Sequence, residues 1–172
     1  HLNIPQGTLM YLDGTLIDSA EGIYYAFKVA CNKIGKKPPT YELFKAHIGP
    51  PIRVLAKIIF CDLKSEEIDE LEAGFRKHYD NEGVFLYKIY DGIDKTIKEL
   101  SKDKNLYMSI VTNKPTLLAY KIVTKQAWGK YFDYVIGIDF PKVKNSDEPF
   151  TNKSEALMYT IKQSGIDSSN TY

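Results

Sequence analysis

The residues best suited to chemistry lie where two predicted strands end. The apolar run 9–12 is followed by Asp13, and the apolar run 106–111 is followed by Thr112 and Asn113. A parallel sheet binds its ligands beyond the carboxyl ends of its strands, so these polar residues are expected to border one crevice. An Asp-Gly-Thr after a strand is, by itself, most often only a turn. The spacing therefore predicts a ligand site only if the rest of the chain supports it.

The second half of the chain alternates strands with helices. After the strand 106–111, a helix is expected from Pro115 to about Ala127, with the proline in its first turn. A strand around 134–138 and a helix from about Lys153 to Ser164 follow it. Strands that alternate with helices predict an α/β fold, with a Rossmann-like parallel sheet and right-handed crossovers.

The residues between the first strand and this region are predicted to be all-helical. Helices are expected from the N-cap Ser19 to Gly35, over 41–47, after Pro51, and through the apolar series Ile68, Leu71, Phe75 and Tyr79. Because this block enters directly after the turn at Asp13, it is expected to lie over the same crevice as a cap. The predicted division is a core of residues 1–18 and 87–172 with an inserted helical cap of residues 19–86.

Composition indicates an ordinary soluble globular protein. The 172 residues are 44% hydrophobic and 26% charged, with a formal net charge of +1, and they show no basic stripe that would indicate a nucleic-acid partner. No apolar run is long enough to cross a bilayer, so a cytoplasmic protein without a membrane partner is expected. Cys31 and Cys61 stand far apart without metal-ligand spacing, and both are predicted to be small core residues.

Several segments, in this order, resemble the haloacid dehalogenase superfamily. They are "LDGTLIDS", "IGPPI", "YDGI", "VTNKP", "YFDYVIG" and "GIDSSNTY". The branch that resembles phosphoglycolate phosphatase, which has a helical cap, matches best. The resemblance implies a hydrolase of small phosphate monoesters that acts through an aspartyl-phosphate, with a small phosphorylated metabolite as its partner. It implies nothing about the oligomeric state.

The resemblance also implies roles for individual residues. In the family motif Asp-x-Asp-Gly-Thr the first aspartate attacks phosphorus and the second is the general acid and base; Asp13 matches the second. Gly14, Thr112 and Asn113 match positions that hold the phosphoryl group. Tyr11 stands at the nucleophile position. A phenol keeps its proton at neutral pH, which makes it a poor nucleophile and a poor ligand for magnesium.

Three further residues are assigned by resemblance. Lys153 matches the lysine that offsets negative charge on the phosphate, and it is preferred over Lys144 because it opens the helix after the last predicted strand. Gly49 and Arg53 match a cap segment that reaches the substrate, and a guanidinium can pair with a carboxylate or a phosphate. The alternative for these two is a tight turn followed by a solvated arginine.

The family binds Mg²⁺ with two aspartates and a backbone carbonyl. The motif that supplies the downstream aspartate is expected after the next strand, where this sequence stops, and Asp167 precedes that position. Of the usual ligands only the Asp13 backbone carbonyl is left, so weak Mg²⁺ binding is expected. Two hypotheses stay open: a phosphatase altered at Tyr11, and a catalytically inactive relative that binds phosphate or a partner.

Overall fold

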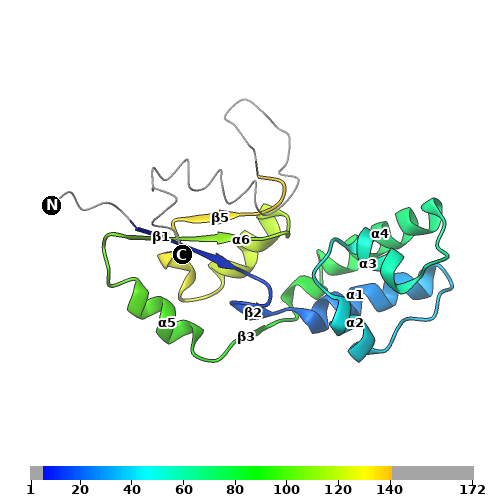
Figure 1. Ribbon diagram of the computed structural model, residues 1–172, viewed down its shortest axis with the longest axis horizontal. Coiled ribbons are helices and arrows are strands. Elements are labelled where there is room, and N and C mark those ends of the chain that lie inside the picture. Colours follow the sequence, from blue (N-terminus) through cyan, green and yellow to red (C-terminus); the bar gives the residue numbers. More distant parts are fainter. Residues whose placement is uncertain (1–5, 141–172) are drawn as a thin grey trace. The chain divides into compact units, whose positions relative to one another are not determined.

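The computed structural model describes residues 6–140, which form two compact units (Figure 1). The helical unit spans Asp18–Lys88, and the sheet unit comprises the described residues on either side of it. The chain passes between the units twice, through the strands β2 (Ile17–Asp18) and β3 (Lys88–Ile89), which form a two-stranded sheet. The helix predicted over 153–164 lies outside the described residues.

The sheet unit is built on three parallel strands in the order β1-β4-β5. They are β1 (Gln6–Tyr11), β4 (Leu106–Val111) and β5 (Tyr134–Ile136). Tyr11 lies beside Val111, and Val111 lies beside Ile136, so the three strands end at the same edge. This confirms the predicted parallel sheet, and it brings the turns that follow β1 and β4 next to each other.

Two α-helices, α5 (Ile93–Leu100) and α6 (Thr116–Thr124), and a short 3-10 turn at Gly129–Tyr131 complete the described part of the sheet unit. The buried residues of α6 are Leu118, Ala119, Ile122 and Val123. This helix ends three residues before the predicted Ala127. The reason is the close approach of Gly129, where a Cβ would overlap the Val123 carbonyl, so the chain folds back over the last turn of the helix.

The helical unit contains four helices and one short 3-10 turn. They are α1 (Ala20–Lys33), α2 (Tyr41–His47), α3 (Ile52–Ile59), α4 (Ser65–Tyr79) and a turn at Gly83–Phe85. The α1 and α4 helices pack against each other at Gly74, where an added Cβ would lie 3.5 Å from the Ala30 Cβ, an ordinary van der Waals distance. The Phe27 ring packs 5.1 Å from the Phe44 ring, which joins α2 to this core.

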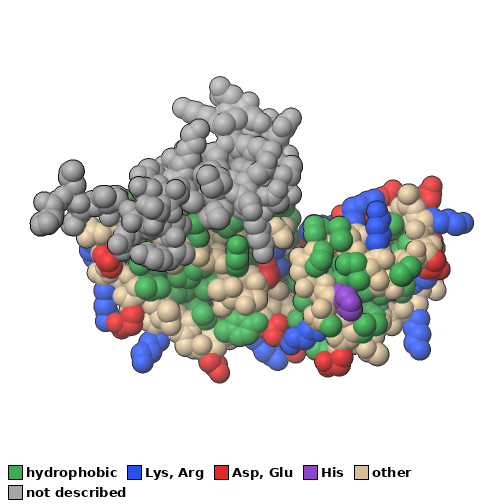
Figure 2. All heavy atoms as spheres, viewed as in Figure 1, with side chains coloured by type: hydrophobic (Ala, Val, Ile, Leu, Met, Phe, Trp, Pro, Cys, Tyr) green, Lys and Arg blue, Asp and Glu red, His purple; other side chains and the backbone are tan. Residues whose placement is uncertain are grey.

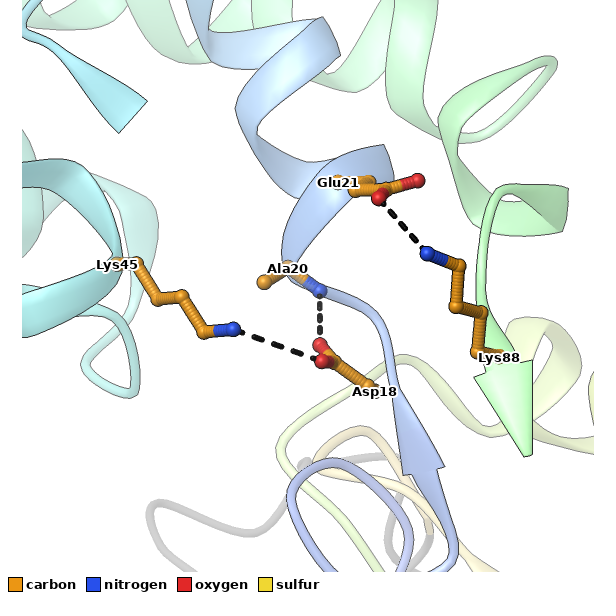
Figure 3. A network of polar contacts seen from close by, with 5 residues as sticks. All are labelled: Asp18, Ala20, Glu21, Lys45 and Lys88. Atoms are coloured by element: carbon orange, nitrogen blue, oxygen red, sulfur yellow. Dashed lines mark hydrogen bonds and ion pairs between the residues drawn. The ribbon is translucent and has the colours of Figure 1, made fainter. Parts of the chain in front are cut away.

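The start of α1 differs from the prediction in one detail. Ser19 occupies the N-cap position, but its side chain makes no capping hydrogen bond, and the Asp18 Oδ1 accepts from the Ala20 N–H at 3.1 Å instead. Figure 3 shows the ion pairs around this helix start: Asp18 with Lys45 at 3.7 Å, and Glu21 with Lys88 at 3.1 Å. Both pairs are exposed enough that each contributes little stability.

The described surface carries charges of both signs. Figure 2 shows Lys and Arg side chains interspersed with Asp and Glu side chains on the face in view, in keeping with the net charge of +1. Among the described residues, no helix combines the length and the apolar character needed to cross a membrane.

The two cysteines lie in different environments. Cys31 is buried in α1, as predicted, and burial raises the pKa of its thiol to about 12. The prediction of a core position is wrong for Cys61, which is exposed in the turn after α3. Because α3 ends at Ile59, Cys61 lies in a solvent-exposed turn although cysteine is usually buried.

We predict that a thiol reagent at mildly alkaline pH modifies one cysteine of the native protein, Cys61, because the thiolate is the reactive form and the Cys31 thiol keeps its proton. Both cysteines should react after denaturation. The measurement is a thiol titration with and without denaturant, and Cys61→Ser should remove the native reaction. Equal reaction of both thiols in the native protein would contradict the burial of Cys31.

Candidate active site

A tight turn holds Asp13 at the end of β1. The Leu12 carbonyl accepts from the N–H groups of Leu16 and Ile17 at 3.0 Å, and the Gly14 N–H donates to the Ile17 carbonyl at 2.9 Å. Gly14 adopts φ +79°, a conformation that costs other L-residues free energy. The Asp-Gly sequence therefore fixes the backbone that carries the Asp13 carboxylate.

The turn after β4 is fixed to the neighbouring strand and to its own side chain. The Thr112 N–H donates to the Ile136 carbonyl at 3.0 Å, which extends the pairing of β4 with β5. The Thr112 Oγ1 accepts from the Lys114 N–H at 3.2 Å, a local bond typical of hydroxyl side chains in turns. Both Thr112 and Lys114 are buried, at 2% and 8% exposure.

The two turns meet at the Asp13 carboxylate. The Lys114 Nζ lies 2.8 Å from Asp13 Oδ1, and the Thr112 hydroxyl donates to Asp13 Oδ2 at 3.4 Å. The second contact is long for a hydrogen bond between oxygens, whereas the first has the length of a strong charge-assisted bond. The structure thus joins a carboxylate, an ammonium and a hydroxyl from residues far apart in the sequence.

Lys114 is the functional candidate that the sequence analysis did not single out. It belongs to the segment "VTNKP", directly after the strand, but a lysine in a polar turn is ordinarily solvated. Its side chain is 7% exposed, and that of Asp13 is 31% exposed. The sequence feature that could have indicated a role for Lys114 is its position two residues after Thr112, at the end of a predicted strand.

The other predicted site residues divide into three groups. Tyr11 is the last residue of β1 and is 48% exposed, and Asn113 is exposed in the turn after β4. Lys153 lies outside the described residues, as does its alternative Lys144. Gly49 and Arg53 belong to the helical unit.

Backbone N–H groups near the start of α6 make hydrogen bonds within the protein. The positions Thr112 and Asn113, which by resemblance hold the phosphoryl group, lie just before this helix. Two of the N–H groups already have acceptors, because the Thr116 N–H donates to Asp139 at 2.7 Å and the Lys114 N–H donates to the Thr112 hydroxyl. These two N–H groups are therefore engaged, whereas the Lys114 and Thr112 side chains lie beside the Asp13 carboxylate.

The segment with Gly49 and Arg53 has a defined geometry within the helical unit. Gly49 adopts φ +140°, which favours glycine, and α3 begins three residues later. The Arg53 Nη1 donates to Glu72 at 2.7 Å and to Asp69 at 2.6 Å, and these hydrogen bonds, that to Glu72 first, raise the pKa of the guanidinium. Arg53 is thus ion-paired with α4.

The described donors do not fit a Mg²⁺ ion. Magnesium prefers an octahedral set of oxygens that includes carboxylates. Asp13 contributes one carboxylate, but its Oδ1 faces the Lys114 ammonium at 2.8 Å, and Tyr11 contributes a phenol where a second carboxylate would stand. Residues 6–140 contain no group of three or more His, Cys, Asp or Glu side chains that could hold a metal.

Comparisons with known proteins agree with the fold. A family model described as haloacid dehalogenase-like hydrolase matches residues 9–170. A phosphoglycolate phosphatase of Aquifex aeolicus is 34% identical over 150 residues, which cover 87% of this chain and 68% of that protein. A phosphoglycolate phosphatase of Pseudomonas fluorescens is 26% identical over 96% of this chain. The chain spans 60% of the length of the Pseudomonas protein.

A solved structure supports the same assignment. The crystal structure of a predicted phosphatase from Clostridium acetobutylicum superposes with a TM-score of 0.78 and 26% sequence identity. The match covers 98% of this chain and 74% of that chain.

We predict that Asp13→Asn destabilises the protein more than Lys114→Met. The asparagine removes the charge that neutralises a buried ammonium, which costs about 3 kcal/mol, whereas the methionine leaves a carboxylate that is partly exposed to water. The measurement is the free energy of unfolding in urea. As a control, Asp62→Asn removes the partner of Lys36 in an exposed ion pair and should cost less than about 1 kcal/mol. A larger loss for Lys114→Met would contradict the pairing.

Proposed function

The chain belongs to the haloacid dehalogenase-like hydrolase family, and on that premise we propose that its site is that of a phosphomonoester hydrolase for small metabolites such as phosphoglycolate. The observation that carries the proposal is the contact of Lys114 with Asp13, 2.8 Å long, beside the Thr112 hydroxyl at the carboxyl ends of β1 and β4. To catalyse phosphoryl transfer, a protein mainly supplies positioned positive charge, hydrogen-bond donors and one group that carries a proton. These three residues supply all of them.

Each residue has a distinct part in the proposed chemistry. Asp13 gives a proton to the leaving alcohol and later takes one from the attacking water. The Lys114 ammonium and the Thr112 hydroxyl stabilise negative charge on the phosphoryl oxygens, since fixed donors in a site with little water are effective there. Gly14 and Asn113 border the same turns, and Lys153 is proposed as a second cation by its match to the family motif.

Tyr11 limits the activity of this sequence. Hydrolysis through a covalent intermediate needs an ionised carboxylate in line with phosphorus, and Tyr11 stands at that position at the end of β1. We therefore propose that this sequence binds the phosphoryl group but turns it over very slowly. The alternative of an inactive binding relative differs in predicting that a restored carboxylate brings no turnover.

The helical unit is proposed to contribute substrate contacts. Both described hydrogen bonds of the Arg53 side chain use Nη1, and a guanidinium has further N–H groups on Nε and Nη2 that can pair with a substrate carboxylate. Gly49 is proposed as a substrate contact by its match to the family segment, and its φ of +140° gives that segment a backbone conformation that favours glycine.

The remaining proposals concern the cofactor and the surroundings. The family implies Mg²⁺, which would neutralise phosphate charge, but the described donors do not fit the ion, so we propose that this chain binds it weakly or not at all, with the Asp13 backbone carbonyl as the one family ligand left. The proposed partner is a small phosphorylated metabolite, and neither nucleic acid nor a membrane. The proposed location is the cytoplasm.

We predict that Tyr11→Asp raises the rate of phosphate release by on the order of a thousandfold, the scale on which loss of a covalent nucleophile slows an enzyme. The assay uses phosphoglycolate and other small phosphomonoesters, with Mg²⁺ and with chelator. It is run on this sequence and, if the coding sequence continues past Tyr172, on the longer product. Tyr120→Asp is the matched control, because it places the same charge on an exposed residue of α6.

The outcomes separate the hypotheses. Turnover by Tyr11→Asp and not by Tyr120→Asp supports the hydrolase. No turnover by any form, with inorganic phosphate still bound, would favour the binding relative. No phosphate binding by any form would refute the phosphoryl site.

A further inference from the structure

A second set of contacts ties the turn that carries Lys114 to the segment after β5. The Asp139 Oδ1 accepts from the Thr116 N–H at 2.7 Å and from the Thr116 hydroxyl at 2.8 Å. The same hydroxyl accepts from the Gly137 N–H at 3.1 Å. The Thr116 side chain therefore bridges two residues of the neighbouring segment, and its bond to the carboxylate is charge-assisted.

These contacts enclose the backbone of Lys114. Its N–H donates to the Thr112 hydroxyl at 3.2 Å, and its carbonyl accepts from the Ile138 N–H at 3.0 Å. A Cβ at Gly137 would overlap the Lys114 carbonyl and the Thr116 nitrogen, so the two segments touch through their main chains. Both backbone polar groups of Lys114 are thus bonded, one inside its turn and one to the segment that follows β5.

A fixed Lys114 backbone matters to the site because it determines where the lysine ammonium can lie. Lysine carries a compact charge on four flexible carbons, so its ammonium reaches a given point reproducibly only if its backbone is fixed. A misplacement of about 1 Å in a catalytic group can cost a hundredfold in rate. The Lys114 ammonium must meet Asp13, which belongs to a different strand, at 2.8 Å.

We infer that Thr116 and Asp139 are positioning residues of the phosphoryl site, which hold the Lys114 backbone so that its ammonium meets Asp13 and the phosphoryl group. The inference rests on the proposed function, since it explains how one residue of that site is aligned. Thr116 and Asp139 act through Lys114, so their effect on phosphate affinity depends on the Lys114 ammonium.

A double-mutant cycle with inorganic phosphate as the probe tests this dependence. Calorimetry measures the phosphate dissociation constant for Thr116→Val and Asp139→Asn, each alone and combined with Lys114→Met. Thr116→Ser keeps the hydroxyl. Thr124→Val is the matched control, because the Thr124 hydroxyl donates to the Tyr120 carbonyl at 2.8 Å on the same helix.

We expect Thr116→Val to weaken phosphate binding roughly five- to tenfold, the effect of losing a charge-assisted hydrogen bond at a partly exposed site. Thr116→Ser and Thr124→Val should bind phosphate like the parent, and Thr116→Val should add little once Lys114 is methionine. If Thr116→Val does not fold, Asp139→Asn gives the same comparison with a smaller change.

Two results would overturn the inference while leaving the proposed function in place. One is unchanged phosphate affinity in Thr116→Val and Asp139→Asn although Lys114→Met weakens binding. The other is an equal loss for Thr116→Val with and without the Lys114 ammonium. If Lys114→Met binds phosphate like the parent, or no form binds it, the proposed site itself fails and the inference fails with it.

Discussion

The contact between the Lys114 ammonium and the Asp13 carboxylate is the interaction on which the site depends. A lysine with a side chain 7% exposed has lost most of its hydration, and the nearby carboxylate must compensate for that loss. The pair can form because β1 and β4 are parallel neighbours that end together, with Tyr11 beside Val111. The sheet topology, the two turns and the charge pair are therefore one arrangement rather than three independent features.

The sheet unit carries the candidate site, and the helical unit has a core of its own. The sheet unit supplies the rigid edge, where hydrogen bonds between backbone groups leave the turns little freedom. The helical unit has its own aromatic core, in which Phe27 packs on Phe44, and its own charged contacts, in which Arg53 pairs with α4. Sites built on strand ends are held more precisely than sites built on long loops, which suits a reaction that needs fixed charges.

Local pattern predicted much of the fold. The strand 106–111 and the helix 41–47 have the predicted bounds, because each is a short periodic run bounded by turn residues. Lys114 was not singled out, because its burial depends on Asp13, a neighbour in space that no local window contains. The end of α6 was placed too late for a similar reason, since it depends on the approach of Gly129 to Val123. For Cys61 the prediction of burial was wrong in the other direction. Cysteine is common in protein cores, but this one lies in an exposed turn.

Anomalous diffraction from crystals of this chain soaked in tungstate, a tetrahedral analogue of phosphate, would show directly whether the site at Lys114 and Asp13 binds a phosphoryl-like anion. We expect one strong tungsten peak at the carboxyl ends of β1 and β4, within hydrogen-bonding distance of the Lys114 ammonium and the Thr112 hydroxyl. A peak at another place in the molecule, or a Lys114 side chain turned away from Asp13, would contradict it.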